Sequence, residues 1–198
     1  MQLWKRKDAK ILESLKERRS YYDINKNLPV EEGKVFDLVE QATELVPDAF
    51  NMKSSRVIVA VGEKHNQLWD NIYDVFQGKV PREKIDSFKN GYGTILYYYD
   101  NDVVKSLQSQ FASYADRFPG WANQSAGMLQ LSIWSGLREL GVGASLQHYN
   151  PVIDEMVREI FNLPESYVLN AQMPFGGIGS HPGEKEKEDI SKRVKIVK

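Results

Sequence analysis

The sequence contains no cysteine in its 198 residues. This absence excludes disulfide bonds, thiolate nucleophiles and cysteine-bound metals, and it agrees with the cytoplasmic location that we expect. A surplus of either charge is missing as well, because 26 basic and 27 acidic residues give a formal net charge of −1. The composition therefore offers no electrostatic argument for a nucleic acid or an anionic membrane as a partner, and we expect neither.

Long apolar runs are also absent. The longest are "VIVAV" at 57–61 and "ILYYY" at 95–99, whereas a membrane-spanning helix needs about 20 apolar residues. The N-terminal "MQLWKRKDAK" has basic residues but lacks the apolar segment of a signal peptide. We therefore expect no transmembrane helix and no secretion signal.

The motifs of several enzyme classes are missing too. The histidines are scattered and no H-E-x-x-H occurs, so we predict no metal site. Neither a G-x-S-x-G nucleophile turn nor a phosphate-binding P-loop is present. Gly141 and Gly143 form a G-x-G, but Leu146 occupies the place of the third glycine in a dinucleotide-binding loop. We interpret Gly141 as the end of a helix and Gly143 as a bend into a buried strand.

Hydrophobic periodicity predicts helices and short strands that do not alternate strictly. The expected helices lie at 8–19, with Asp8 as the cap, and at 31–46, 68–76, 102–116, 121–141 and 151–161. The expected strands lie at 56–62, 93–100, 142–147, 166–177 and 193–198. The helix at 121–141 is apolar nearly all round, which predicts burial in the centre or against a second subunit. We expect one α+β domain over residues 1–198, with a mixed central β-sheet flanked by helices.

Three polar clusters lie at the ends of predicted elements. They comprise Arg18, Arg19 and Ser20; Asn51, Lys53 and Ser54; and Lys185, Lys187 and Arg193. Adjacent arginines and a serine can bind a phosphate through bidentate bonds and a hydroxyl, and a lysine from a distant segment can complete the charge balance. Each cluster alone is equally typical of a solvated helix end, and the run "EKEKED" is typical of a solvated turn.

Four segments taken together resemble the FMN-dependent nitroreductase family. In order along the chain they are "RRSYYDINKNLP", "FNMKSSRVIVAVG", "GVGASLQHYNP" and "MPFGGIGSHPGEKEKEDISKRVK". The resemblance covers about residues 8–198, its most specific part is "LGVGASLQHYNP", and it is strongest to the fatty-acid-repression-like and stress-induced subgroup.

The resemblance implies a nitroreductase-like FMN-binding fold in an intertwined homodimer, with FMN at the subunit interface. It implies that the segment at about 184–198 reaches the partner subunit. It also implies a ping-pong reaction in which NADH or NADPH delivers a hydride to flavin N5 and a nitroaromatic compound or quinone then takes the donor's place. Because the flavin carries this chemistry, no catalytic side chain is expected.

The resemblance also implies cofactor contacts. It assigns Arg18 and Ser20 to the phosphate and ribityl chain, with Arg19 beside them. It assigns Lys185 and Arg193 to a basic pair on the phosphate, with Lys187 as an alternative, and Asn51 to the flavin of the partner subunit. It places four residues along the isoalloxazine, with the backbone N–H of His148 as the donor to N5: Leu146, Gln147, His148 and Tyr149.

Two residues depart from the family pattern. Tyr22 stands where many relatives carry a basic residue, so it can stack or bond without supplying charge. Lys53 stands where many carry glutamine. Either its charge lies near flavin N1 and O2, where it would raise the flavin potential, or it points to solvent.

Aromatic side chains gather around "SYADRFPGWANQ". They offer flat apolar surface for a nicotinamide or a nitroarene, or they are core or dimer packing; they are Phe111, Tyr114, Phe118 and Trp121. Two other functions stay open beside the nitroreductase or quinone reductase: a relative that dehalogenates or fragments flavin, and a flavin-binding stress or regulatory protein with weak turnover.

Overall fold

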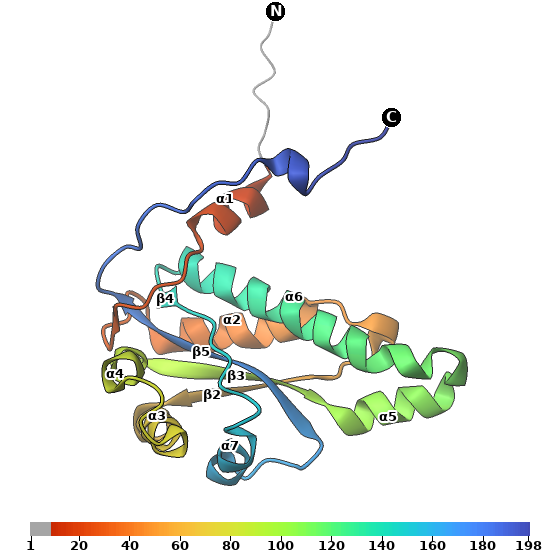
Figure 1. Ribbon diagram of the computed structural model, residues 1–198, viewed down its shortest axis with the longest axis horizontal. Coiled ribbons are helices and arrows are strands. Elements are labelled where there is room, and N and C mark those ends of the chain that lie inside the picture. Colours follow the sequence, from red (N-terminus) through yellow and green to blue (C-terminus); the bar gives the residue numbers. More distant parts are fainter. Residues whose placement is uncertain (1–8) are drawn as a thin grey trace, which may run out of the picture.

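A five-stranded sheet forms the centre of the computed structural model, which describes residues 9–198 (Figure 1). The strand order is β1-β5-β3-β2, with β4 pairing to β5. The strands are β1 (Ile24–Asn25), β2 (Ser55–Val61), β3 (Gly93–Asp100), β4 (Gly143–Ala144) and β5 (Tyr167–Ile178). The α+β class is confirmed. The sheet is less mixed than predicted, because all the strand ladders within residues 9–198 are antiparallel and the one parallel pairing is the isolated bridge between Ser20 and Ala144.

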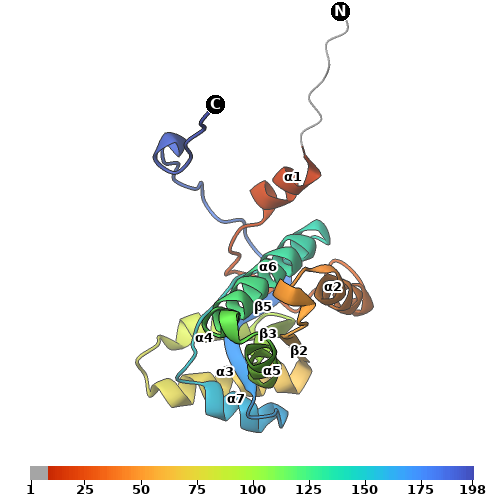
Figure 2. The same ribbon diagram turned by 90° about the vertical axis from the view of Figure 1, so that its right-hand side faces the viewer.

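Helices cover both faces of this sheet, as the end-on view in Figure 2 shows. One face carries α2 (Glu32–Leu45) and α6 (Phe118–Glu139), and the other carries α3 (Gly62–Phe76), α4 (Arg82–Lys89) and α7 (Asp154–Phe161). The helix α5 (Asn101–Gln110) continues directly from β3. The helix α1 (Lys10–Glu17) and the C-terminal segment both project from the side of α6, and the cap predicted at Asp8 lies outside the described residues. Between residues 9 and 198, no helix combines the length and apolar character needed to cross a membrane.

The alternation of side chains along β3 creates two separate cores. Ile95 and Tyr97 are buried in the core beneath α2 and α6. Leu96 and Tyr98 point to the opposite face and are buried with side chains of α3, α4 and α7. Both sets are apolar because a central strand with helices on each face has no solvent-exposed side.

The helix α6 starts earlier than the sequence predicts. Residues 117–121 read as a loop because of Pro119 and Gly120, yet the helix begins at Phe118 with the proline in its first turn, where a missing N–H costs nothing. Its 22 residues span about 33 Å. The helix therefore connects two distant regions of the molecule.

Two further predictions are corrected by the structure. "RVKIVK" at 193–198 forms no strand, because none of the strands within residues 9–198 pairs with it, and Ile196 and Val197 remain 79% and 80% exposed. The helix α4 is missing from the predicted elements; it has Pro81 as its cap residue and buries Ile85 and Phe88 completely.

Gly177 in β5 leaves no room for a side chain. An added Cβ would overlap the backbone carbonyl oxygen of Asn27, which cannot rotate away. We expect Gly177→Ala to lower the free energy of unfolding by about 2 kcal/mol, measured by urea denaturation. The matched control is Gly127→Ala in α6, where nothing lies within 4 Å of the new methyl group and stability should rise by up to about 1 kcal/mol. Equal effects of the two substitutions would contradict this account.

Candidate functional site

The first and third polar clusters meet in one groove. The chain becomes extended at Arg18, directly after α1, and the C-terminal segment returns alongside it. The groove has a volume of about 500 Å³, and its lining includes Arg18, Arg19, Lys185 and Lys187. Arg19 Nη2 donates a hydrogen bond of 2.8 Å to the carbonyl oxygen of Gly183, which ties the two segments together. Four of the residues predicted at or beside the phosphate are therefore neighbours: Arg18, Arg19, Lys185 and Lys187.

The electrostatics of this groove favour an anion. Five cationic side chains line it against the carboxylates of Glu184 and Glu186. The guanidinium of Arg18 lies 4.1 Å from the ring centroid of Trp134. Burial, and secondarily the charge of Arg19, lower the pKa of Arg18. Because two guanidinium groups repel each other here, a phosphate between them would remove a cost that the protein otherwise carries.

The chain that follows the arginines of the groove is joined to β4. Ser20 forms a parallel bridge with Ala144, and the Tyr21 N–H donates to the Ala144 carbonyl oxygen at 3.0 Å. The indole N–H of Trp134 donates to the same oxygen at 3.1 Å. Ser20 and Tyr21 are thus held beside Ala144, two residues before the "LQHY" segment, although more than a hundred residues separate them in the chain.

Backbone amides alternate in direction along residues 145–149. The amides of Ser145 and Gln147 donate to carbonyl oxygens of β5, and that of Tyr149 donates to the Gln172 side chain at 2.8 Å. The amides of Leu146 and His148 face away and meet no acceptor within residues 9–198. This is the unpaired outer edge of a strand, which is a natural binding edge for polar ligand atoms.

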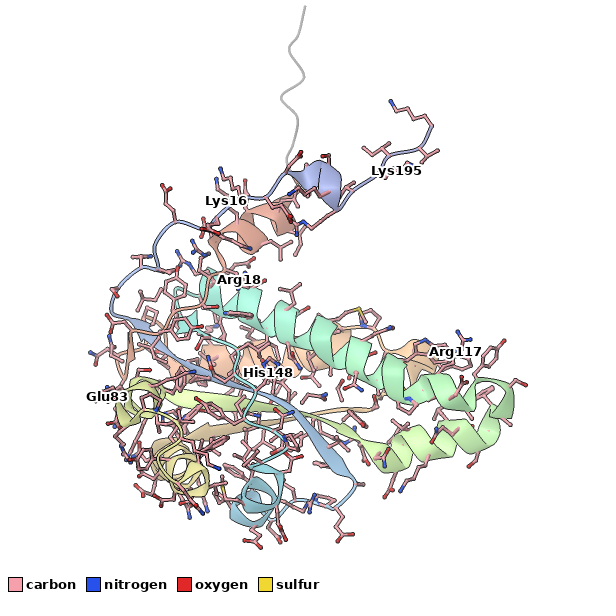
Figure 3. The ribbon with its side chains drawn as sticks, in the orientation of Figure 1. Lys16, Arg18, Glu83, Arg117, His148 and Lys195 are labelled. Carbon is pink, nitrogen blue, oxygen red and sulfur yellow. The ribbon has the colours of Figure 1, made fainter. Side chains whose placement is uncertain are left out.

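Side chains in this segment alternate as well. Gln147 and Tyr149 are buried, each 8% exposed, and Tyr149 packs edge-on against Trp69 and Phe76. The His148 side chain is exposed, and Figure 3 places it on the segment between β4 and α7. The side chains of Gln147 and Tyr149 therefore belong to the core, whereas the backbone amides of Leu146 and His148 are free, within the described residues, to bind a ligand.

The second polar cluster lies at the other end of α6. Asn51 ends the short helix η1 (Ala49–Asn51), and Asn51 and Lys53 line a separate cavity of about 220 Å³. The Lys53 side chain is 67% exposed, and its Nζ lies 3.8 Å from Glu44 Oε1. Figure 3 shows Arg117 and Arg18 at opposite ends of α6. Within a single chain, Asn51 and Lys53 are thus remote from the cationic groove.

The predicted aromatic residues form one cluster around Phe50, a residue that the sequence analysis missed. The ring centroids of Phe111, Tyr114, Phe118 and Trp121 lie 4.9, 6.0, 5.2 and 5.6 Å from that of Phe50. Phe118 is fully buried and presents no surface to a ligand, whereas Phe111 and Tyr114 are 39% and 49% exposed. Phe50 follows a turn and carries no local signal of the contacts that it makes with residues 61 or more positions later.

Two predicted residues lie outside the groove. The Tyr22 ring packs against Phe88, with centroids 6.3 Å apart, and lines a different pocket together with Ser87 and Asn90. Arg193 extends along the C-terminal segment and pairs with Glu188 at 3.5 Å. Neither residue contributes to the groove in this chain.

A groove lined by five cationic side chains suits an anionic group. The chain belongs to the nitroreductase family, whose sequence model matches residues 15–177. Membership in this family supports the assignment of the chain as a flavin-dependent oxidoreductase.

Individual relatives agree with this assignment. HBN1 of Saccharomyces cerevisiae is 30% identical over 187 residues, which are 92% of this chain and 96% of that protein. The nitroreductase CinD from Lactococcus lactis, solved with chloramphenicol, is 41% identical with a TM-score of 0.90, covering 95% of this chain and 100% of that one. CinD has also been solved with nicotinic acid and with 4-nitrophenol. A protein from Exiguobacterium sibiricum, solved in complex with FMN, shares the fold at 13% identity and a TM-score of 0.74, covering 96% of this chain and 98% of that one.

Proposed function

We propose that this chain is an FMN-dependent oxidoreductase that uses NADH or NADPH to reduce nitroaromatic compounds or quinones. The observation that carries the proposal is the cationic groove, next to which Ser20 pairs with Ala144, two residues before the first of the unpaired amides at 146 and 148. The CinD structures with nicotinic acid, a nicotinamide analogue, and with 4-nitrophenol, a nitroarene, support the choice of donor and acceptor.

The residues of the groove fit the phosphate of FMN. Arg18 and Arg19 would bind its oxygens, Lys185 or Lys187 would complete the charge balance, and the Ser20 hydroxyl would donate to the phosphate or ribityl chain. Bound FMN would supply the redox chemistry, and we propose that the nucleotide and the acceptor react with it in ping-pong order.

The edge after β4 fits the flavin ring. The His148 N–H would donate to N5, and the Leu146 side chain would shield the ring from water. Gln172 keeps this edge in place, because its backbone pairs with Gln147 and its side-chain oxygen accepts from the Tyr149 amide. No side chain in the groove is needed as an acid or base, since the acceptor can take protons from solvent.

We further propose that the functional unit is an intertwined homodimer of the stress-related subgroup. The cationic groove and the Asn51 cluster lie at opposite ends of α6, so one chain cannot supply both to one flavin. A second copy can. Apolar side chains are available for the contact, since Met128 and Leu131 on α6 are 44% and 43% exposed. In such a dimer, residues 184–198 would reach the partner, and Arg193 would approach the partner's groove.

The test is an anaerobic reductive half-reaction. The purified protein should carry bound FMN, and NADH or NADPH should bleach its absorbance rapidly, followed by reoxidation with a nitroarene or quinone. Bound flavin that neither nucleotide reduces would refute the proposed enzyme and favour a flavin-binding regulatory protein.

The backbone N–H of His148 and its side chain are tested by separate substitutions. We expect His148→Ala to keep FMN and at least about half of the activity, because the exposed imidazole has no assigned task and the amide is retained. His148→Pro deletes the N–H itself and should lower the rate of flavin reduction strongly at equal flavin content. An inactive His148→Ala variant that is fully loaded with flavin would contradict the assignment.

A further inference from the structure

The segment from Phe50 to Lys53 has an unusual backbone. Phe50, Asn51 and Lys53 have φ angles of 56°, 49° and 51°. Residues other than glycine seldom adopt this left-handed conformation, and it is rarest for bulky side chains. Such a backbone persists only where surrounding contacts determine it, and it is concentrated at functional sites.

The carboxylate of Asp48 fixes the start of this segment. Its Oδ2 accepts hydrogen bonds from the amide and hydroxyl of Ser54, at 2.9 and 2.8 Å. Its Oδ1 accepts from the hydroxyl of Ser125 at 2.7 Å. Ser54 and Ser125 are buried, so these bonds are shielded from water and bind the segment to α6.

Arg56 fixes the other end. Its Nη1 donates to the carbonyl oxygens of Lys53 and Ser55, at 2.8 and 3.0 Å. Its Nη2 donates to Asp100 Oδ2 at 3.0 Å, which holds the guanidinium against β3. The strained residues therefore lie between two anchored points.

The consequence of this anchoring is a fixed aromatic surface. The Phe50 ring lies nearly parallel to that of Trp121, at an interplanar angle of 23°, and 48% of Phe50 remains exposed. Phe118, by contrast, contacts the same ring but is fully buried. Core packing would not require a strained residue with half of its surface free, whereas a stacking surface that is ordered in advance binds flat ligands at low entropic cost.

We propose that Phe50 is a specificity-determining residue on which flat aromatic acceptors stack, and that Asp48 is the positioning residue that holds its ring in place. This proposal rests on the proposed function, since it names the acceptor class of the same site. In the proposed dimer, the ring would face the flavin bound mainly by the partner subunit.

The first test replaces the ring. Phe50→Leu should weaken binding of 4-nitrophenol to the oxidised holoenzyme about ten-fold, measured by calorimetry. The ratio of kcat/KM for 4-nitrophenol to that for ferricyanide, which needs no stacking surface, should fall by a similar factor. Phe50→Tyr keeps the flat ring and should restore both quantities, and Phe50→Gly relaxes the backbone while still losing 4-nitrophenol binding.

The second test loosens the anchor. Asp48→Asn leaves one acceptor oxygen where three hydrogen bonds now converge, so it should raise the KM for 4-nitrophenol a few-fold with a smaller change in kcat. The matched control is Asp102→Asn, an exposed aspartate whose carboxylate lies 3.9 Å from Lys105 Nζ. That control should leave both constants unchanged.

The outcomes separate cleanly. Unchanged 4-nitrophenol affinity in Phe50→Leu would overturn the proposal. Unchanged affinity together with weaker dimerisation, measured by analytical ultracentrifugation, would show that the ring is interface packing. A parent protein without flavin, or with flavin that neither nucleotide reduces, would instead overturn the proposed function, and this is established before any variant is made.

Discussion

Replacing Arg18 and Ser20 together by alanine is expected to weaken FMN binding at least about 100-fold. Arg18 faces the groove shared with Lys185 and Lys187, and Ser20 is fixed beside it by the bridge to Ala144. The double variant removes a charge-assisted bidentate contact and a hydroxyl donor. It also leaves fewer cations near the phosphate, and the electrostatic attraction that is lost is larger in a partly desolvated groove than in water. The measurement is a fluorescence titration of the apoprotein with FMN.

Lys84→Ala is the control for general charge effects, because Lys84 is an exposed residue of α4, on the opposite face of the sheet from α6. Thermal unfolding of the apoprotein provides a second control, since Arg18→Ala also removes the contact with the Trp134 ring. An FMN affinity of the double variant that equals those of Lys84→Ala and the parent protein would refute the phosphate assignment.

The stability of the protein should fall as the pH drops from about 6.5 to about 4, and His65 should account for much of the loss. The side chain is 1% exposed. Its Nδ1 lies 2.9 Å from Thr94 Oγ1 and its Nε2 3.1 Å from the Lys89 carbonyl oxygen. A neutral ring satisfies both partners when Nε2–H donates to the carbonyl and Nδ1 accepts from the hydroxyl. That hydroxyl oxygen also accepts from the indole N–H of Trp69 at 2.8 Å.

Burial lowers the pKa of His65 from 6.5 to about 4; the charges of Lys26 and Lys89 lower it further, and the bond to the Lys89 carbonyl works in the opposite direction. The unfolded chain therefore binds a proton at a pH where the folded chain does not. The contribution of neutral His65 to the free energy of unfolding is fully present above about pH 6.5 and decreases until the histidine of the folded chain also protonates near pH 4. The full loss is about 3 kcal/mol.

Urea denaturation at several pH values from 4 to 7.5 measures this dependence. His65→Gln should be less stable at neutral pH, because the network with Thr94 and Lys89 is disturbed, but its stability should vary less with pH. His181→Gln, at an exposed histidine, should keep the parent's pH dependence. An unchanged slope in His65→Gln would exclude His65 as the cause.

Elements whose signal is local were predicted well. The α2 helix and strands β2, β3 and β5 lie within a few residues of their predicted bounds, because their side-chain period of 3.6 or 2 reflects a buried face. The α4 helix was missed since only Ile85 and Phe88 give it an apolar face, and tertiary packing stabilises it. The C-terminal strand failed for the converse reason, because an alternating pattern forms a strand only beside another strand.

The candidate site divides in the same way. The arginine pair and the "LQHY" segment could be identified from motifs, and the structure brings them together through the bridge between Ser20 and Ala144. Phe50 could not, because its importance arises from a left-handed backbone and from neighbours far along the chain. Arg193 lies outside the groove and pairs with Glu188, and no local pattern in the sequence distinguishes it from the lysines that line the groove.

The position of β5 in the sheet has a consequence for the synthesis of this protein. This strand pairs with β1, β3 and β4, yet it comprises residues 167–178 of 198. A nascent chain that lacks it has a β2–β3 hairpin with one edge of β3 unpaired and both apolar faces incompletely covered. Unpaired edges of this kind recruit other strands, so incomplete chains are prone to aggregate. We therefore expect that the sheet closes only after β5 has been synthesised, and that a chain truncated before residue 167 cannot close it.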